Sequence, residues 1–173
     1  DRWFRPVDIT QAPDGSLYIA DFYNCIIGHY EVRLDHPRRD RQLGRIWRVI
    51  YKGTADKPAP APRIMPDLTK LDATQLLGKL DDVNLQVRIL ATNEMVDRIG
   101  APAAEVVRAN MAKLSDVQRA HGLWVIERTH GLTSHELIQL AKDADPLVRV
   151  HVIRAMDSRP MWSAEPDLRG MTE

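Results

Sequence analysis

Arginine is the residue type best suited to chemistry in this sequence, and six arginines gather between positions 33 and 48. The same stretch holds two acidic residues, so its local formal charge is +4. A guanidinium group donates two parallel hydrogen bonds to a carboxylate or a phosphate, so such a cluster is typical of a site for an anionic ligand or cofactor. The residues that we expect at this site are Arg39, Arg41, Arg45, His29 and Asp8.

A structural role is the alternative for this cluster. In that case Asp40 pairs with a neighbouring arginine and holds the loop together, and an exposed pair of this kind contributes only about 0–1 kcal/mol. Side chains alternate along a strand, so Arg45 and Arg48 point to opposite faces of the strand that ends the cluster. The arginines therefore cannot all serve one site, and Arg48 is the one that we most expect to be structural.

The rest of the sequence contains few other candidates for chemistry. It has no Gly-rich phosphate loop, no GxSxG motif and no HExxH motif for zinc. The single cysteine, Cys25, excludes a disulfide or a Cys-rich zinc site within the chain, and we expect a small buried side chain there. His121 and His151 occupy equivalent positions of a helical repeat and are expected, like Trp124 and Trp162, to serve packing. We therefore assign no metal site and no catalytic residue.

Charge and composition exclude several classes of protein. The chain carries 24 Lys and Arg against 24 Asp and Glu, and a formal charge of zero argues against a nucleic-acid-binding or membrane-surface protein. No apolar run reaches the ~18 residues that a transmembrane helix needs, and no signal peptide opens the sequence. The chain starts at Asp1 rather than Met, and we interpret it as a piece of a longer protein.

The N-terminal part of the sequence has the pattern of an antiparallel sheet. Apolar and polar residues alternate over 7–11, a turn follows at Pro13-Asp14-Gly15, and residues 17–20 form a short apolar run. The turn residues fix or permit the dihedral angles that a tight reversal needs, and the apolar run predicts a buried strand. Residues 44–51 give a third strand, and a sheet this small is not stable by itself.

The composition changes after these strands. Eight of the ten aromatic residues precede position 52. The stretch that follows alternates Pro and Ala, a composition that favours extended polyproline geometry and predicts a semi-rigid spacer. We therefore divide the chain into a sheet region at residues 1–52, a Pro/Ala-rich linker at 53–68, and a helical region at 69–173.

The helical region carries six signals of the kind that begin a helix, and apolar residues at helical spacing follow each one, Leu90 and Ile153 among them. The signals are Asp72, Asn84, Pro102, Ser115, Thr133 with Glu136, and Asp145-Pro146. The six helices form three pairs, because Arg88, Arg119 and Arg149 stand at equivalent places, 31 and 30 residues apart. A fixed period of helix pairs is the signature of an α-solenoid, and an ordinary helical bundle is the alternative.

Two stretches resemble known families. The sequence Asp145-Pro146-Leu147-Val148-Arg149 resembles the D-x-x-V-R segment of HEAT repeats. Near the N-terminus, the pieces WFRPVD, PDG, YIAD, HP, RDR and GRIWR resemble the last propeller blade of bacterial PVC-type membrane-bound dehydrogenases, a haem-binding CxxCH family. That family is similar to the quinoprotein glucose and sorbosone dehydrogenases. The resemblance implies a mixed fold, β then α, with a terminal antiparallel β-propeller blade followed by an α-solenoid of HEAT-like helix pairs.

The same resemblance implies a function for the parent protein. The parent would be a propeller-type oxidoreductase that binds PQQ, and the arginine cluster would hold a carboxylate of that quinone. Haem c would belong to a region absent from this chain, and the present residues alone are expected to be inactive. The implied partners are the remaining blades and a protein bound on the helical repeats, in a periplasmic or extracellular compartment. The alternative is a non-catalytic protein-interaction scaffold.

Overall fold

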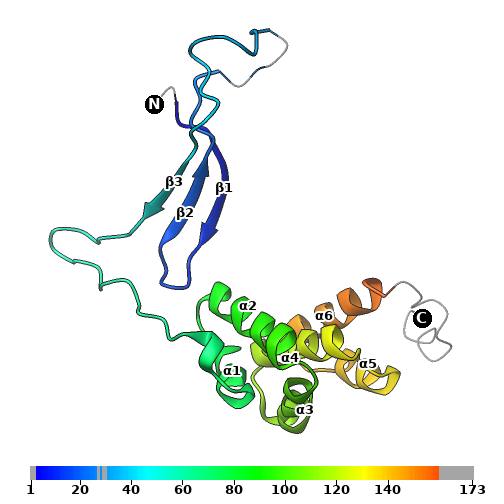
Figure 1. Ribbon diagram of the computed structural model, residues 1–173. Helices are drawn as coiled ribbons and strands as arrows, with labels where there is room; N and C mark the ends of the chain where they lie inside the picture. The colour runs from blue at the N-terminus through cyan, green and yellow to red at the C-terminus, as the bar shows by residue number, and fades with distance from the viewer. Residues whose placement is uncertain (1–2, 27, 29–30, 160–173) are drawn as a thin grey trace. The chain divides into compact units, whose positions relative to one another are not determined.

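The computed structural model describes residues 3–26, 28 and 31–159, and the predictions for His29 and Trp162 lie outside these residues. The chain divides into two compact units, Asp1–Met65 and Pro66–Glu173. The first unit contains a small antiparallel sheet, and the second contains six α-helices (Figure 1). The mixed β-then-α character expected from the sequence is therefore confirmed.

Three strands make the sheet of the first unit: β1 (Pro6–Gln11), β2 (Leu17–Asp21) and β3 (Arg45–Val49). They are antiparallel in the order β1-β2-β3, so β2 is central. The turn between β1 and β2 is closed by Asp14, whose carboxylate accepts hydrogen bonds from the amide and the hydroxyl of Ser16, at 2.9 and 2.6 Å. Gly15 has a φ of +88°, a conformation that suits glycine in such a turn.

Both faces of this sheet are open. Ile9 lies opposite Ile19 and Trp47 on one face and is 59% exposed, while Ile46 lies on the other face and is 75% exposed. The prediction of a buried β2 is wrong for this unit, since Leu17 and Tyr18 are exposed and only the terminal Asp21 is buried. The apolar run favoured a buried strand, but within the described part of this unit no second layer covers the sheet.

The Pro/Ala-rich stretch folds back before it extends. Gly53 and Pro58 form a β-bridge, and the amide of Ala59 donates to the carbonyl of Lys52 at 2.9 Å. Gly53 has a φ of +77°, and a Cβ there would lie 2.3 Å from the carbonyl oxygen of Lys57. The prediction of an extended spacer is therefore wrong for its first residues, 53–58, which form a tight loop that needs a glycine.

The second unit begins with η1 (Leu68–Lys70) and contains six α-helices. The α-helices are α1 (Ala73–Lys79), α2 (Leu85–Asn93), α3 (Ala101–Asn110), α4 (Asp116–Thr129), α5 (Ser134–Ala141) and α6 (Pro146–Asp157). A π-helical turn, η2 (Glu94–Ile99), continues α2, and a 3-10 turn, η3 (Met111–Lys113), continues α3. The six predicted start signals are confirmed at the first turns of α1 to α6.

The helices pack as consecutive pairs around one hydrophobic core. α1 packs on α2, α3 on α4 and α5 on α6, while α4 also contacts both α2 and α6. Ile126 belongs to this core and is fully buried, and Gly122 lets α4 approach Val107 of α3 closely. Leu90 of α2 and Ile153 of α6 are exposed, which corrects their expected place on buried faces.

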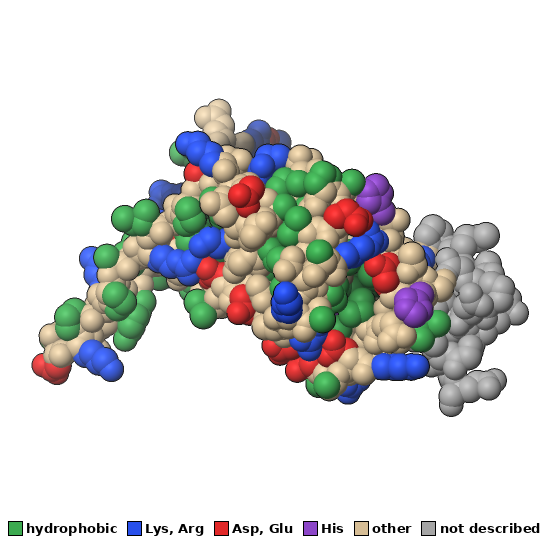
Figure 2. All heavy atoms as spheres, turned by 90° about the horizontal axis from the view of Figure 1, so that it is seen from below, with side chains coloured by type: hydrophobic (Ala, Val, Ile, Leu, Met, Phe, Trp, Pro, Cys, Tyr) green, Lys and Arg blue, Asp and Glu red, His purple; other side chains and the backbone are tan. Residues whose placement is uncertain are grey.

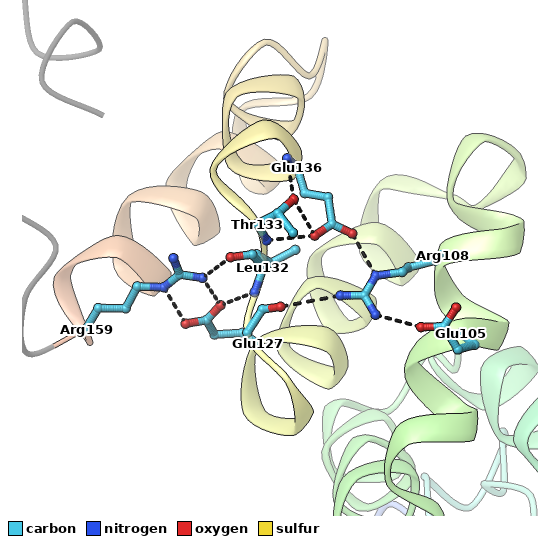
Figure 3. Close-up of polar contacts among 8 residues, drawn as sticks. Glu105, Arg108, Glu127, Leu132, Thr133, Glu136 and Arg159 are labelled. Carbon is cyan, nitrogen blue, oxygen red and sulfur yellow. Dashed lines mark hydrogen bonds and ion pairs between the residues drawn. The ribbon is translucent and has the colours of Figure 1, made fainter. Parts of the chain in front are cut away.

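Ion pairs tie the helices together at the surface of this core. Arg108 of α3 bonds Glu136 of α5 at 2.7 Å, and Arg159, after α6, bonds Glu127 of α4 (Figure 3). Acidic and basic side chains also alternate with apolar ones on the face shown in Figure 2. None of the helices within the described residues has the length and apolar character needed to cross a membrane.

Candidate anion site in the loop between β2 and β3

The long connection between β2 and β3 brings two of the predicted arginines together. Arg39 and Arg41 line one open pocket of about 440 Å³. The other residues around this pocket are Phe22, Asn24, Asp40, Gln42, Leu43 and Gly44. The pocket combines two guanidinium groups with two side-chain amides and a carboxylate, so its lining suits a small polar ligand.

Hydrogen bonds between side chains and the backbone hold this connection in place. The side-chain Nδ2 of Asn24 donates to the carbonyl of Asp40 at 2.7 Å, and the half-buried thiol of Cys25 donates to the carbonyl of Arg38 at 3.2 Å. The carboxylate of Asp40 accepts from the amides of Gln42 and Leu43, at 2.9 and 3.1 Å. The expected pairing of Asp40 with an arginine is therefore corrected, because this carboxylate caps a backbone turn.

The two pocket arginines are themselves engaged with the backbone. One terminal nitrogen of Arg39 donates to the carbonyls of Gly28 and Val32, and one of Arg41 donates to the carbonyl of Leu34. The Nε of Arg39 is buried and has no hydrogen-bond partner among the described residues. Arg39 therefore fixes the loop with one edge and keeps an unused donor, whereas the exposed Arg41 keeps the rest of its guanidinium group in solvent.

Arg45 and Asp8 do not line this pocket. The guanidinium carbon of Arg45 lies 3.4 Å from the centre of the Tyr23 ring and 5.7 Å from that of Trp47, which is a cation–π arrangement. The carboxylate of Asp8, exposed on β1, accepts a hydrogen bond from the amide of Ile9. The structure thus places Arg39 and Arg41 at one pocket, and Arg45 and Asp8 are not among the residues that line it.

Asp21 organises the corner at the end of β2. Its side chain is 3% exposed and accepts from the amides of Arg5 and Tyr23 and from the indole of Trp47, at 2.7, 2.8 and 2.7 Å. Burial raises the pKa of Asp21. The hydrogen bonds and the charge of Arg45 together lower this pKa by more than burial raises it, so it lies below the usual value. Tyr23 has a φ of +45°, which the corner imposes on a bulky residue. Asp21 is therefore a structural carboxylate that stays ionised.

Arg48 has the structural role that the strand alternation predicts. It donates to the carboxylate of Asp14 at 2.5 Å and to the hydroxyl of Ser16 at 3.3 Å. The hydrogen bonds from Ser16 and the nearby Arg48 lower the pKa of Asp14 to about 2. These contacts fasten β3 to the turn between β1 and β2.

The helical unit contains a second polar arrangement, which the sequence predicts only in part. Arg119 of α4 bonds the carboxylate of Asp143, before α6, through Nε at 2.7 Å and Nη2 at 2.9 Å. Asp143 precedes Arg149 by six residues, as Asp82 precedes Arg88. This repeated spacing is the feature of the sequence from which an ion pair between successive helix pairs, such as Arg119 with Asp143, could have been predicted.

Two histidines also join successive helix pairs. Arg88 of α2 donates to Nε2 of His121 at 3.3 Å, and Nδ1 of His121 lies 3.1 Å from the hydroxyl of Thr92. Trp124 of α4 donates to Nδ1 of His151 at 2.9 Å. Burial lowers the pKa of His121 to about 4, with smaller effects from Arg88 and His151, and burial and Arg154 lower that of His151. Within the residues that the structure describes, no three His, Cys, Asp or Glu side chains form a group that could hold a metal.

Comparison with known proteins places only the first unit. Residues 1–53 match the family model described as a domain of unknown function, DUF7133. No curated protein matches the chain, and no solved structure matches it either. The match covers the strands and the loop that holds the arginine pocket, and it stops before the helical unit.

Proposed function

We propose that this chain is an assembly module of a larger protein, to which it supplies one β-propeller blade and a stack of HEAT-like helix pairs. In this proposal residues 1–52 are the blade, and the helix pairs form an α-solenoid within residues 69–173. The partners are neighbouring blades, which cover the sheet, and a protein bound on the helical stack. The structure contains the sheet and the helices, and their assignment to a propeller blade and a solenoid rests on the resemblance to known families.

The observation that carries this proposal is the exposure of apolar side chains on both faces of the sheet. A solvated antiparallel sheet usually keeps one polar face, whereas here Ile9 and Ile46 are exposed on opposite faces. Propeller blades pack against neighbours on both sides, and this geometry calls for apolar residues on each face. The packing of α4 on both α2 and α6 supports the stacked-pair assignment for the helices.

Dye binding tests the open sheet in the full chain. We expect ANS, which fluoresces on exposed apolar surface, to bind this protein, and we expect both Ile9→Lys and Ile46→Lys to reduce its fluorescence. Neither variant should change the thermal unfolding of the helices, because both side chains are exposed. Val83→Lys is the matched control, since Val83 is an exposed apolar residue of the helical unit. Equal loss of fluorescence in all three variants would contradict the proposal.

A second candidate function is that of a propeller-type oxidoreductase that uses PQQ in the periplasm or outside the cell. The pocket lined by Arg39 and Arg41 is the observation that favours it, because PQQ carries carboxylates that guanidinium groups recognise. The backbone engagement of both arginines favours the assembly role instead. The assembly module is therefore our first proposal.

Titration with PQQ separates the two candidates. If the pocket holds the quinone, Arg41→Ala should weaken binding by roughly 1.5–3 kcal/mol, the contribution of a hydrogen bond to a charged group. Arg45→Ala is the comparison, since Arg45 stacks on Tyr23 outside the pocket. Unchanged PQQ affinity in both variants, with a lower melting temperature, would leave the arginines a structural role only.

A further inference from the structure

The three equivalent arginines of the helical unit are anchored in the same way. In Arg88, Arg119 and Arg149, Nη1 donates to backbone carbonyls five or six residues earlier in the chain. The acceptors are the carbonyl oxygens of Asp82 and Val83, of Leu114, and of Asp143 and Ala144, respectively. Each guanidinium group is thus fixed by the segment that precedes its own helix.

The opposite edge of the first two arginines binds the next helix pair. Nε of Arg88 donates to His121 of α4. Nε and Nη2 of Arg119 donate to the two carboxylate oxygens of Asp143, between α5 and α6. An anchored arginine that offers two parallel donors is a geometric match for a carboxylate.

In Arg149 this second edge is unoccupied among the residues that the structure describes, and the surface beside it is apolar. Val150 and Ile153 are exposed, Ile153 to 66%. The corresponding residues of α4, one and four positions after Arg119, are Ala120 and Leu123, and both are buried. The face of α6 that carries Arg149 therefore corresponds to the face of α4 that is buried within the stack of helix pairs.

We propose that this face of α6 is a docking surface for a further helix pair that presents a carboxylate in the loop before its second helix. The surface continues the established interface between α4 and α6, where Asp143 supplies that carboxylate. Its basic residues, Arg149 and Arg154, complement an acidic loop, and its apolar residues match a helix face. The inference rests on the proposed stacking of helix pairs and does not involve the sheet.

Acetate tests the carboxylate specificity on the unmodified chain. With NMR of the arginine Nε–H groups, we expect acetate to shift the Arg149 signal at a concentration at least about tenfold lower than for Arg154, because a preorganised donor pair binds more tightly. Arg154 is the exposed arginine on the same helix, and Arg119 is the occupied control, whose signal should not move. Equal responses of Arg149 and Arg154 would overturn the proposal.

Duplication of the last helix pair tests the whole surface. A second copy of residues 130–159 inserted after Arg159 repeats the spacing of 30 residues between Arg119 and Arg149. We expect the melting temperature of the helices to rise by about 4 °C or more. Asp143→Asn in the copy alone, or Ile153→Ser in the original α6, should remove this rise.

The outcomes of the duplication are decisive. The proposal would be overturned if the melting temperature did not rise, or if neither substitution affected the rise. It would also be overturned if the unmodified chain formed a dimer that Ile153→Ser dissociates. Such a dimer would make a second copy the occupant. Because the sheet variants Ile9→Lys and Ile46→Lys do not touch α6, failure here is distinguishable from failure of the blade proposal.

Discussion

Arg88, Thr92 and His121 form one hydrogen-bond network in the helical unit. The hydroxyl of Thr92 donates to the carbonyl of Arg88, and the same hydroxyl lies beside Nδ1 of His121. Because Nε2 of His121 accepts from Arg88, its proton is assigned to Nδ1, which donates to Thr92. A protonated His121 would lose the acceptor at Nε2 and place two positive groups in contact.

The sign of the resulting pH dependence follows from the pKa of His121. An unfolded histidine takes up a proton below about pH 6.5, whereas folded His121 has a pKa of about 4. The unfolded state therefore binds more protons between these values, and the stability contributed by neutral His121 is complete above pH 6.5 and lost as the pH falls toward 4.

We expect this loss to appear in the thermal unfolding of the helices. The melting temperature should fall between pH 6.5 and 4, and His121→Gln should make the fall shallower because glutamine does not titrate. His135→Gln is the matched control, since His135 is exposed on α5. An equal pH dependence in the wild type and in His121→Gln would contradict this assignment.

At the scale of elements, the sequence predicts the parts that depend on local chemistry. Asp72, Ser115 and Thr133 each cap a helix and form a capping box with the residue three positions later. Such caps depend on a few neighbouring residues, so they are readable in one sequence. Exposure depends instead on which other elements cover a residue, and the local sequence does not show this. For that reason the predicted burial of β2 and of Ile153 is wrong.

The candidate site was less predictable than the elements. Of the residues expected at the site, Arg39 and Arg41 line one pocket, because both lie in one loop. The stacking of Arg45 on Tyr23 depends on a corner with positive φ, which the sequence does not show. The turn-capping role of Asp40 depends on the loop's backbone course, so charge alone predicted an ion pair instead.

The packing of α3 on α4 gives a test at this scale. A Cβ at Gly122 would lie 2.7 Å from Cγ1 of Val107, whereas a Cβ at Gly78 of α1 would meet nothing within 4 Å. We expect Gly122→Ala to destabilise the helices by about 1–3 kcal/mol through overpacking. Gly78→Ala should stabilise them by about 0.5–1 kcal/mol, because alanine favours helix.

Chemical unfolding of the two variants measures this difference. Adding Val107→Ala to Gly122→Ala should recover part of the loss, since it removes the methyl group in conflict. Equal effects of Gly122→Ala and Gly78→Ala would show that α3 and α4 do not approach as closely as the structure has them.

At the scale of the whole molecule, the two units differ in how they bury apolar surface. The helical unit encloses a continuous core that includes Leu76, Leu123 and Val152. The sheet instead leaves most of its apolar side chains in solvent, and its order depends on hydrogen bonds around Asp14 and Asp21. A three-stranded sheet without a covering layer is marginal in water. We therefore expect one stable unit and one unit that requires neighbours.

Amide hydrogen exchange of the full chain measures this difference most directly. We expect the amide of Ile19, in the central strand, to exchange at least about a hundredfold faster than those of Leu123 and Ile126, because local opening is easiest where few apolar contacts are buried. Replacing Ile126 with Ala should cost about 2–5 kcal/mol in the helices and leave the exchange of Ile19 unchanged. Exchange of Ile19 as slow as that of the helical core would contradict an incomplete sheet, and with it the proposal that this chain contributes a blade to a larger protein.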